Sequence, residues 1–231
     1  MDREPVSELN NARILVFGAS GGLGAPITTK LARAGARLAV SGRNTDALTA
    51  TGAHIIAADL RHVDSARTVL AEAADKLGGL DGIVIAAGVV AFGPAAELDD
   101  DVVDDLLIVN YLAPLRIIRE ALTVLEPAGF VLNISAVVAD QPVAGMSAYS
   151  ASKAAISAFV ASVRIEARRS TIRVIDVRPP HTETGLATHA IAGNAPHLPT
   201  GLTPDQVAER IVAAIVNDET DVPPPEFTTS S

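Results

Sequence analysis

Residues 13–24 read Arg-Ile-Leu-Val-Phe-Gly-Ala-Ser-Gly-Gly-Leu-Gly, a largely apolar run followed by a glycine-rich segment. The run over 13–17 predicts a buried strand, and residues 22–34 predict the helix that follows it. Glycines let the backbone turn tightly and approach a ligand closely, and a helix N-terminus offers unpaired N–H groups that suit a pyrophosphate. Because a strand and a helix flank the glycines, we favour a nucleotide-binding loop over a glycine-rich turn without a ligand.

Short aliphatic runs alternate with longer stretches of helical period along the rest of the chain. We expect strands at 13–17, 37–41, 54–58, 82–86, 129–135 and 172–177, and helices at about 22–34, 45–51, 63–77, 99–125, 148–169 and 204–217. Strands that are apolar almost throughout are typical of a parallel sheet covered on both faces. The alternation predicts an α/β fold, a single doubly wound parallel sheet of the Rossmann type over residues 12–222, with helices on both faces. Residues 1–11 and 223–231 are expected to be flexible ends.

Composition narrows the class of protein. The 231 residues are 48% hydrophobic, which supports a sizeable core, and they carry a formal net charge of −9. Such an acidic balance argues against binding to nucleic acid or to an anionic membrane surface. The chain has no cysteine, and its histidines lack the spacing of a metal motif, so we expect no metal site. No apolar run is long enough for a membrane span, and no apolar region of the signal-peptide kind follows residues 1–5, so a cytoplasmic location is expected.

The end of the second expected strand bears on the choice of nucleotide, because doubly wound sheets bind ligands beyond the carboxyl ends of their strands. An acidic residue at this point accepts hydrogen bonds from a ribose 2′-hydroxyl, but this chain reads Ser41-Gly42-Arg43. Arg43 is a permanent cation whose shape matches a phosphate, so we expect NADP(H) rather than NAD(H). The alternative is an arginine that is simply solvated at the surface.

Tyr149 and Lys153 lie at the start of the long helical segment at 148–169. Residues four apart share a helical face, so the phenol and the ammonium can point into one site. A nearby cation is expected to lower the pKa of Tyr149 from its ordinary value of about 10. Such a tyrosine exchanges a proton with a carbonyl or an alcohol while a hydride moves. The alternative is an ordinary helix pair, because this spacing also occurs by chance.

Together these motifs resemble the short-chain dehydrogenase/reductase superfamily, classical type, over about residues 12–217. The glycine motif of the family matches Gly18, Gly22 and Gly24, with Phe17 where threonine is usual. The resemblance implies an NADP(H)- or NAD(H)-dependent oxidoreductase that uses the Tyr149–Lys153 pair.

Several residue roles follow from the resemblance alone. It implies that Lys153 also holds the nicotinamide ribose and that Asn110 supports Lys153 through a water. It also implies that Asp59, followed by Leu60, holds the adenine amino group. The predicted catalytic residues are Tyr149, Lys153, Ser135 and Asn110. The predicted cofactor-binding residues are Gly18, Ser20, Gly21, Gly22, Leu23, Gly24, Ser41, Arg43, Asp59, Leu60, Ala86, Ala87, Gly88, Asn110, Tyr149, Lys153, Pro179 and Thr184.

The chain departs from the family pattern at the serine that orients the substrate carbonyl. That serine usually lies thirteen residues before the tyrosine, a position that is Ala136 here, with Ser135 beside it. A shift of one residue along a strand turns a side chain to the opposite face. Either the strand end bulges and brings Ser135 into the site, or the site lacks this hydroxyl. We expect the bulge, and Ser147 is a possible substitute.

Two other departures affect the cofactor side of the site. The Asn-Asn-Ala-Gly of the family reads Ile-Ala-Ala-Gly over 85–88, so the Ala87-Gly88 half remains beside the cofactor. The Pro-Gly of the family reads Pro179-Pro180, which stiffens the turn, and Thr184 has the offset of the threonine that contacts nicotinamide or phosphate.

The leading hypothesis is an oxidoreductase that transfers a hydride between NADP(H) and a small carbonyl or secondary-alcohol substrate. Loops 90–98 and 181–203 are expected to decide the substrate. A catalytically weak NAD(P)-binding sensor or scaffold is the alternative, and a lyase or isomerase on the same fold is a third reading. The resemblance further implies a homodimer or homotetramer.

Overall fold

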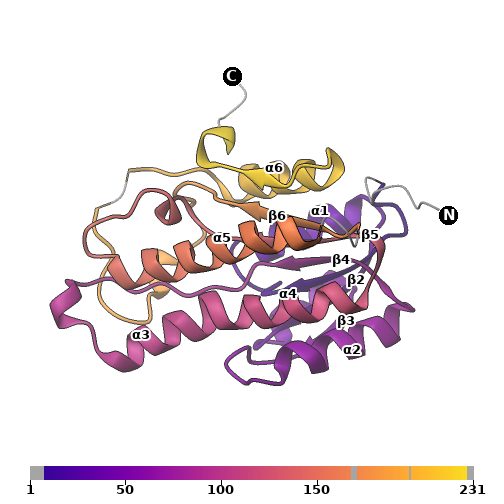
Figure 1. Cartoon of the computed structure of the whole chain (residues 1–231), viewed down its shortest axis with the longest axis horizontal. Helices are drawn as coiled ribbons and strands as arrows, with labels where there is room; N and C mark the ends of the chain where they lie inside the picture. Colours follow the sequence, from indigo (N-terminus) through magenta and orange to yellow (C-terminus); the bar gives the residue numbers. More distant parts are fainter. Residues whose placement is uncertain (1–7, 168–170, 198, 228–231) are drawn as a thin grey trace.

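The computed structural model describes residues 8–167, 171–197 and 199–227. Within them, one sheet of seven strands has the order β3-β2-β1-β4-β5-β6-β7, and every neighbouring pair is parallel (Figure 1). The strands are β1 (Arg13–Phe17), β2 (Arg37–Gly42), β3 (His54–Ala57), β4 (Leu80–Ile85), β5 (Leu125–Ile134), β6 (Arg173–Val177) and β7 (Asp221–Val222). The predicted doubly wound fold is confirmed.

Helices cover both faces of this sheet (Figure 1). α1 (Gly24–Arg33) and α6 (Pro204–Val216) pack together on one face, and α2 (Ser65–Leu77), α4 (Ala113–Val124) and α5 (Ser147–Ala167) lie on the other. Successive side chains of a strand alternate between the two faces. In β1, accordingly, Ile14 and Val16 pack with α1 and α6, whereas Leu15 and Phe17 pack with the other three helices. Burial on both faces is the reason that the strands are apolar throughout.

The prediction of a single helix over residues 99–125 is wrong. The structure has α3 (Asp100–Leu107), a π-helical turn (Ile108–Leu112) and then α4. Pro114 lies in the first turn of α4 and has no N–H to donate to the carbonyl four residues earlier, which interrupts the regular ladder. The short helix expected at 45–51 is a 3-10 helix (Asp46–Thr51). Residues 168 and 169 of the helix expected over 148–169 lie outside the described residues.

Parts of the two ends that were expected to be flexible are packed against the core in this structure. Residues 224–227 form a 3-10 turn (Pro224–Phe227), and the Phe227 side chain is buried in the core beside α6. Arg210 of α6 pairs with the Glu226 carboxylate at 2.6 Å and donates to the Glu226 carbonyl at 3.0 Å. Leu9 near the N-terminus is buried in the same cluster. Residues 1–7 and 228–231 lie outside the described residues.

None of the described helices combines the length and the apolar character needed to cross a membrane.

Truncating Phe227 tests whether the C-terminal turn belongs to the folded core. We expect Phe227→Ala to lower the free energy of unfolding by about 3 kcal/mol, because removal of a buried ring loses its transfer energy and leaves a cavity. Urea denaturation measures the change. Val216→Ala, at a 41% exposed position on α6, is the control and should change stability by less than about 1 kcal/mol. Equal effects of the two substitutions would contradict this account of the C-terminal turn.

Candidate functional site

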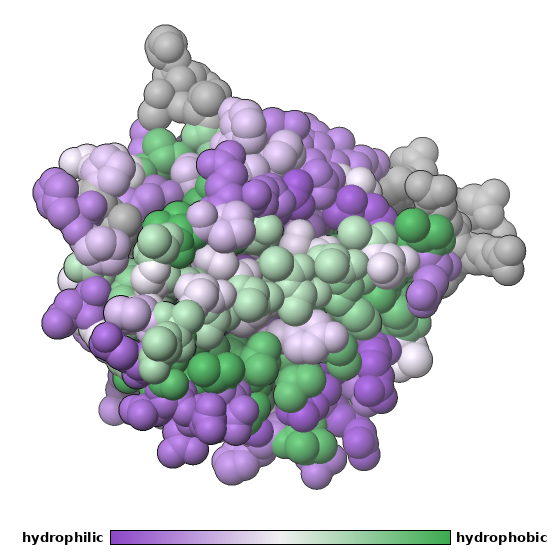
Figure 2. Space-filling view, turned by 60° about the vertical axis from the view of Figure 1, so that its left-hand side comes forward, coloured by the Kyte–Doolittle hydropathy of each residue, from purple (hydrophilic) through white to green (hydrophobic). Residues whose placement is uncertain are grey.

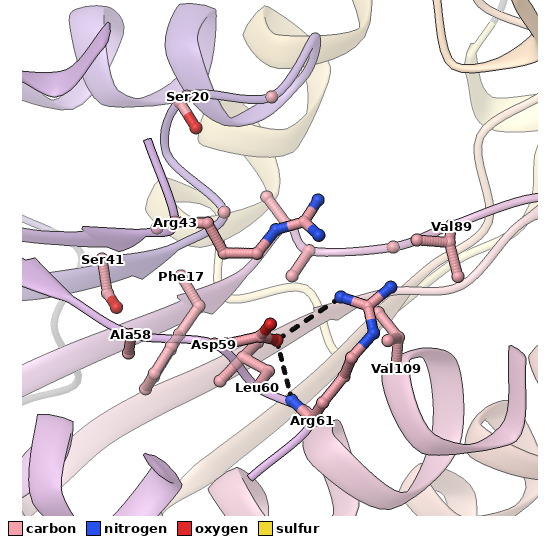
Figure 3. Close-up of a pocket in the computed structure, with 16 residues that line it drawn as sticks. Phe17, Ser20, Ser41, Arg43, Ala58, Asp59, Leu60, Arg61, Val89 and Val109 are labelled. Carbon is pink, nitrogen blue, oxygen red and sulfur yellow. Dashed lines mark hydrogen bonds and ion pairs between the residues drawn. The ribbon is translucent and has the colours of Figure 1, made fainter. Parts of the chain in front are cut away.

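Two cavities adjoin above the carboxyl ends of the strands. The first, of about 150 Å³, is lined by the glycine-rich loop and by the ends of β2, β3 and β4 (Figure 3). The second, of about 320 Å³, is lined by the end of β5, the start of α5 and the segment after β6. Gly21 and residues 86–88 line both cavities, so the two form one groove at the edge of the sheet.

Tight packing inside the protein explains the glycines of the first loop. Gly18 has φ +72°, and a Cβ placed there would lie 2.6 Å from the Ala87 nitrogen. A Cβ on Gly24 would collide with the Gly18 carbonyl, and one on Gly22 would collide with the Thr184 carbonyl. The loop therefore runs flush against the segment after β4. No side chain caps the N-terminus of α1, which leaves that end of the helix open to a ligand from the groove.

Most of the predicted binding residues line these cavities. The first cavity is lined by Gly18, Ser20, Gly21, Ser41, Arg43, Asp59, Leu60, Ala86, Ala87 and Gly88. The second is lined by Gly21, Gly22, Leu23, Ala86, Ala87, Gly88, Ser135, Tyr149, Lys153, Pro179 and Thr184. Gly24 and Asn110 line neither cavity, because Gly24 is packed beneath the loop and Asn110 is bonded within the core. Ser147 is exposed and also lines neither cavity.

Two arginines approach one carboxylate in the first cavity. Figure 3 shows Arg61 bonded to Asp59, with the Arg43 side chain extending across the cavity near the same carboxylate. Burial alone would raise the pKa of Asp59, but the hydrogen bond from the Arg61 amide and the charges of Arg61 and Arg43 outweigh it and hold that pKa below its usual value. Arg43 makes no hydrogen bond or ion pair with the part of the chain that the structure describes, so its guanidinium is free to bind an anion.

Sequence reasoning missed Arg61, which also lines the first cavity. Arg61 is held by Asp105 of α3 through contacts of 2.6 and 2.7 Å, and it donates to Asp59 at 3.4 Å. These bonds tie α3 to the loop after β3. Arg61 directly follows Asp59 and Leu60. Its charge, just beyond the carboxyl end of a strand, was the sequence signal that could have identified it as a cavity residue.

Tyr149 and Lys153 both lie on the buried face of α5 and line the second cavity. The Lys153 Nζ donates to the Ile134 carbonyl at the end of β5, 3.0 Å away. A Cβ placed on Gly88 would lie 3.5 Å from the same Nζ, so the ammonium adjoins the boundary between the two cavities. Burial lowers the pKa of Lys153 to about 8, against the opposing charge of Asp176.

The expected direction of the Tyr149 pKa is wrong in this structure. Burial raises the pKa of Tyr149 to about 12, because desolvation disfavours the phenolate. The phenol is therefore protonated throughout the neutral range. In this state it can donate a proton.

Asn110 acts through direct hydrogen bonds in the core. Its Oδ1 accepts from the Val89 amide at 3.0 Å, and its Nδ2 donates to the Val89 carbonyl at 2.9 Å and to the Ser152 Oγ at 3.1 Å. Asn110 lies in the π-helical turn between α3 and α4, so it joins that turn to the segment after β4 and to α5. The predicted link to Lys153 through a water stays a prediction.

The bulge expected at Ser135 is not present. The pairing of β5 with β6 keeps one register from Phe130 to Ile134, without a shift at the strand end. The Ser135 hydroxyl donates to the Asp176 carboxylate at 2.6 Å and so points into a buried polar cluster. Ala136 lies in the wall of the second cavity, half-buried, at the position of the missing hydroxyl.

The second cavity has an apolar lining that sequence reasoning did not identify. Side chains from three separate segments contribute to it: Val90, Phe92, Val137, Val138, Val143, Met146, Leu186 and Ala187. Among the residues that line it, Lys153 and His181 are the ones with basic side chains, and none is acidic. No group of three or more histidines, aspartates and glutamates able to hold a metal ion occurs among the described residues.

Comparisons with known proteins agree with this geometry. The family model described as short chain dehydrogenase matches residues 12–194. The chain is 31% identical to the "Uncharacterized oxidoreductase MexAM1_META1p0182" of Methylorubrum extorquens, over 93% of this chain and 94% of that protein. It is 30% identical to "Glycine betaine reductase ATRR" of Emericella nidulans over 93% of its own length, although it spans only 18% of that much longer protein.

A solved structure shares both the fold and part of the sequence. It is a short chain dehydrogenase from Burkholderia cenocepacia in complex with NADP, with a TM-score of 0.82, 26% identity and coverage of 94% of this chain and 97% of that one. The family match, the relatives and the parallel sheet with its groove lead to one conclusion: this chain belongs to the short-chain dehydrogenase family.

Proposed function

We propose that this protein is an NADP(H)-dependent oxidoreductase that transfers a hydride between the cofactor and a carbonyl or secondary alcohol, with Tyr149 as the acid/base. The observation that carries the proposal is that Tyr149 and Lys153 line one cavity, which opens directly into the cavity beside the glycine-rich loop. A dinucleotide that spans the groove would bring its reactive ring to the tyrosine.

The residues of the first cavity suit the adenine half of such a cofactor. The open N-terminus of α1 suits the pyrophosphate, and the free guanidinium of Arg43 suits a 2′-phosphate. Lys153, beside Gly88, is within the part of the groove that would hold the nicotinamide ribose. When bound, the nicotinamide supplies or accepts the hydride. The similar dehydrogenase of Burkholderia cenocepacia was solved in complex with NADP, and this supports the choice of cofactor.

In the reducing direction, Tyr149 would give its hydroxyl proton to the carbonyl oxygen as the hydride reaches the carbonyl carbon. The pKa of Tyr149, raised to about 12 by burial, keeps that proton in place at neutral pH. The Lys153 ammonium, one helical turn away, would stabilise the phenolate that remains until it is reprotonated.

The apolar lining of the second cavity supports an uncharged substrate with a hydrocarbon body. Phe92, Val138, Met146 and Leu186 offer no partner for a carboxylate or a phosphate. Burial of a charged group against them would be costly. We therefore propose apolar ketones, or the corresponding alcohols, as the substrate class.

Two observations favour the sensor or scaffold reading: the family's asparagines are absent at Ile85 and Ala86, and Ala136 supplies no hydroxyl at the expected position. A homodimer or homotetramer and a cytoplasmic location stay predictions.

Removal of the Tyr149 hydroxyl tests the acid/base role. We expect Tyr149→Phe to lower kcat for reduction of apolar ketones by NADPH at least about 100-fold, because general acid catalysis is lost, with NADPH affinity nearly unchanged. Tyr111→Phe is the matched control, since Tyr111 is the other tyrosine of the chain and lines neither cavity. NADPH binding without turnover in the wild type would favour the sensor. Full activity of Tyr149→Phe would refute the proposed chemistry.

Arg43 tests the choice of cofactor. Loss of a charge-assisted contact with the 2′-phosphate should weaken NADPH binding by about 10- to 100-fold in Arg43→Ala. NADH binding, which lacks that phosphate, should change by less than about 3-fold. Dissociation constants from fluorescence titration provide the comparison, with the exposed Arg67→Ala as control. If Arg43→Ala weakens the binding of NADPH and NADH equally, Arg43 does not contact the 2′-phosphate.

Ala136→Ser tests whether the missing hydroxyl limits the rate. A serine at this point of the cavity wall should donate to the oxygen as it gains charge, and we expect kcat/KM to rise about 10-fold or more. Ala139→Ser, in the short 3-10 helix that follows Ala136 (Val137–Ala139) but outside the cavity lining, should leave the rate unchanged. If kcat/KM of Ala136→Ser is no higher than that of the wild type, another group already donates a hydrogen bond to the substrate oxygen.

A further inference from the structure

Asp176 is a carboxylate inside the hydrophobic core. It lies on β6, is 1% exposed and is the cross-strand neighbour of Asn133 on β5. A buried carboxylate is costly unless it is fully paired, and an apolar residue is often no less stable at such a place. The proposed function gives this charge no role.

Four donors surround the Asp176 carboxylate. Its Oδ1 accepts from the Ser135 hydroxyl at 2.6 Å and from the Asn133 amide nitrogen at 3.1 Å. Its Oδ2 accepts from the Ser157 hydroxyl at 2.7 Å and from the Arg178 guanidinium at 2.9 Å. Each of the two carboxylate oxygens therefore accepts two hydrogen bonds.

These bonds connect the carboxylate to the elements that hold Lys153. Ser157 follows Lys153 by one turn on the same face of α5. Asn133 and Ser135 flank Ile134, whose carbonyl accepts from the Lys153 Nζ at 3.0 Å. Through Ser157, the Asp176 carboxylate therefore ties α5 to the residues on both sides of Ile134 at the end of β5.

The charge of Asp176 also acts on Lys153 directly. Burial lowers the pKa of Lys153 to about 8, and the negative charge of Asp176 opposes that effect. Other charged or titratable groups face this region from the helix, the strands and the loops: Tyr149, Arg164, His181, Arg178, Asp140 and Asp221. Arg178 forms ion pairs with Asp140 and Asp221 as well as with Asp176, so each of these two acids has a cationic partner of its own.

We propose that Asp176 is a positioning residue that sets both the place and the charge of Lys153. Its carboxylate fixes the turn of α5 that bears the lysine against β5, and it supplies a negative charge that acts on the buried ammonium. The role in turnover rests on the proposed function of Lys153. The same contacts engage the Ser135 hydroxyl within the buried cluster. The Tyr149 hydroxyl is then the one that remains for the substrate.

Titration of Lys153 in neutral variants tests the proposal. The chain has three lysines, Lys30, Lys76 and Lys153, so NMR of protein labelled with carbon-13 at lysine Cε gives signals that are simple to assign. In Asp176→Asn, we expect the titration midpoint of Lys153 to fall by about one pH unit or more, because the negative charge that favours the ammonium form is removed. Asp176→Ser removes the same charge in a smaller side chain and serves if the first variant does not fold.

Asp221→Asn is the matched control, because Asp221 pairs with the same Arg178 but does not contact Ser135, Asn133 or Ser157. It should leave the Lys153 midpoint unchanged. The alkaline limb of kcat/KM should move to lower pH in the Asp176 variants by the same amount as the midpoint. An unchanged midpoint in the neutral Asp176 variants, or an equal shift in Asp221→Asn, would overturn the proposal. If the midpoint shifts but the wild-type protein shows no turnover, the effect of Asp176 on Lys153 is supported and the oxidoreductase function is contradicted instead.

Discussion

The close contact between the loops that leave β1 and β4 is the constraint on which the groove depends. These two strands pair in parallel at the centre of the sheet, so both loops leave it at the same edge. Gly18 runs against Ala87 so closely that any side chain at Gly18 would meet the backbone of its neighbour. The contact brings the glycine-rich loop beside residues 86–88, which line both cavities. The nucleotide side and the chemical side of the groove are thereby continuous.

Buried polar groups, in addition to apolar packing, hold the chemical side in place. Asn110 satisfies both backbone groups of Val89 and reaches Ser152 on α5. Asp176 gathers donors from β5 and α5 in a second cluster. Directional bonds of this kind define one arrangement, because a misplaced helix would leave polar atoms unpaired at a high cost in free energy. Apolar packing alone would tolerate more variation in the position of α5.

The wall of the second cavity shows how the position of a serine along the strand decides which groups its hydroxyl meets. With Ala136 at the end of β5, the nearest serine hydroxyl faces the opposite side of the strand and is bonded to Asp176. The site therefore presents the Tyr149 phenol beside an otherwise apolar wall. Burial keeps that phenol protonated, which fits a proton donor in a reduction better than a permanent base.

Local pattern was sufficient for much of the fold and for part of the groove. The aliphatic runs predicted six of the seven strands, and the glycines, Arg43 and the Tyr149–Lys153 spacing identified residues in both cavities, but not the apolar wall of the second. The two-residue strand β7 is too short to have a periodicity of its own, and the burial of Phe227 depends on α6. The direction of the Ser135 hydroxyl and the raised pKa of Tyr149 depend on contacts and desolvation between segments far apart in the chain. Sequence by itself determined which elements form, because their periodicity is local. Only the tertiary structure decided which buried polar groups meet, because that depends on the register and packing of β5, β6 and α5.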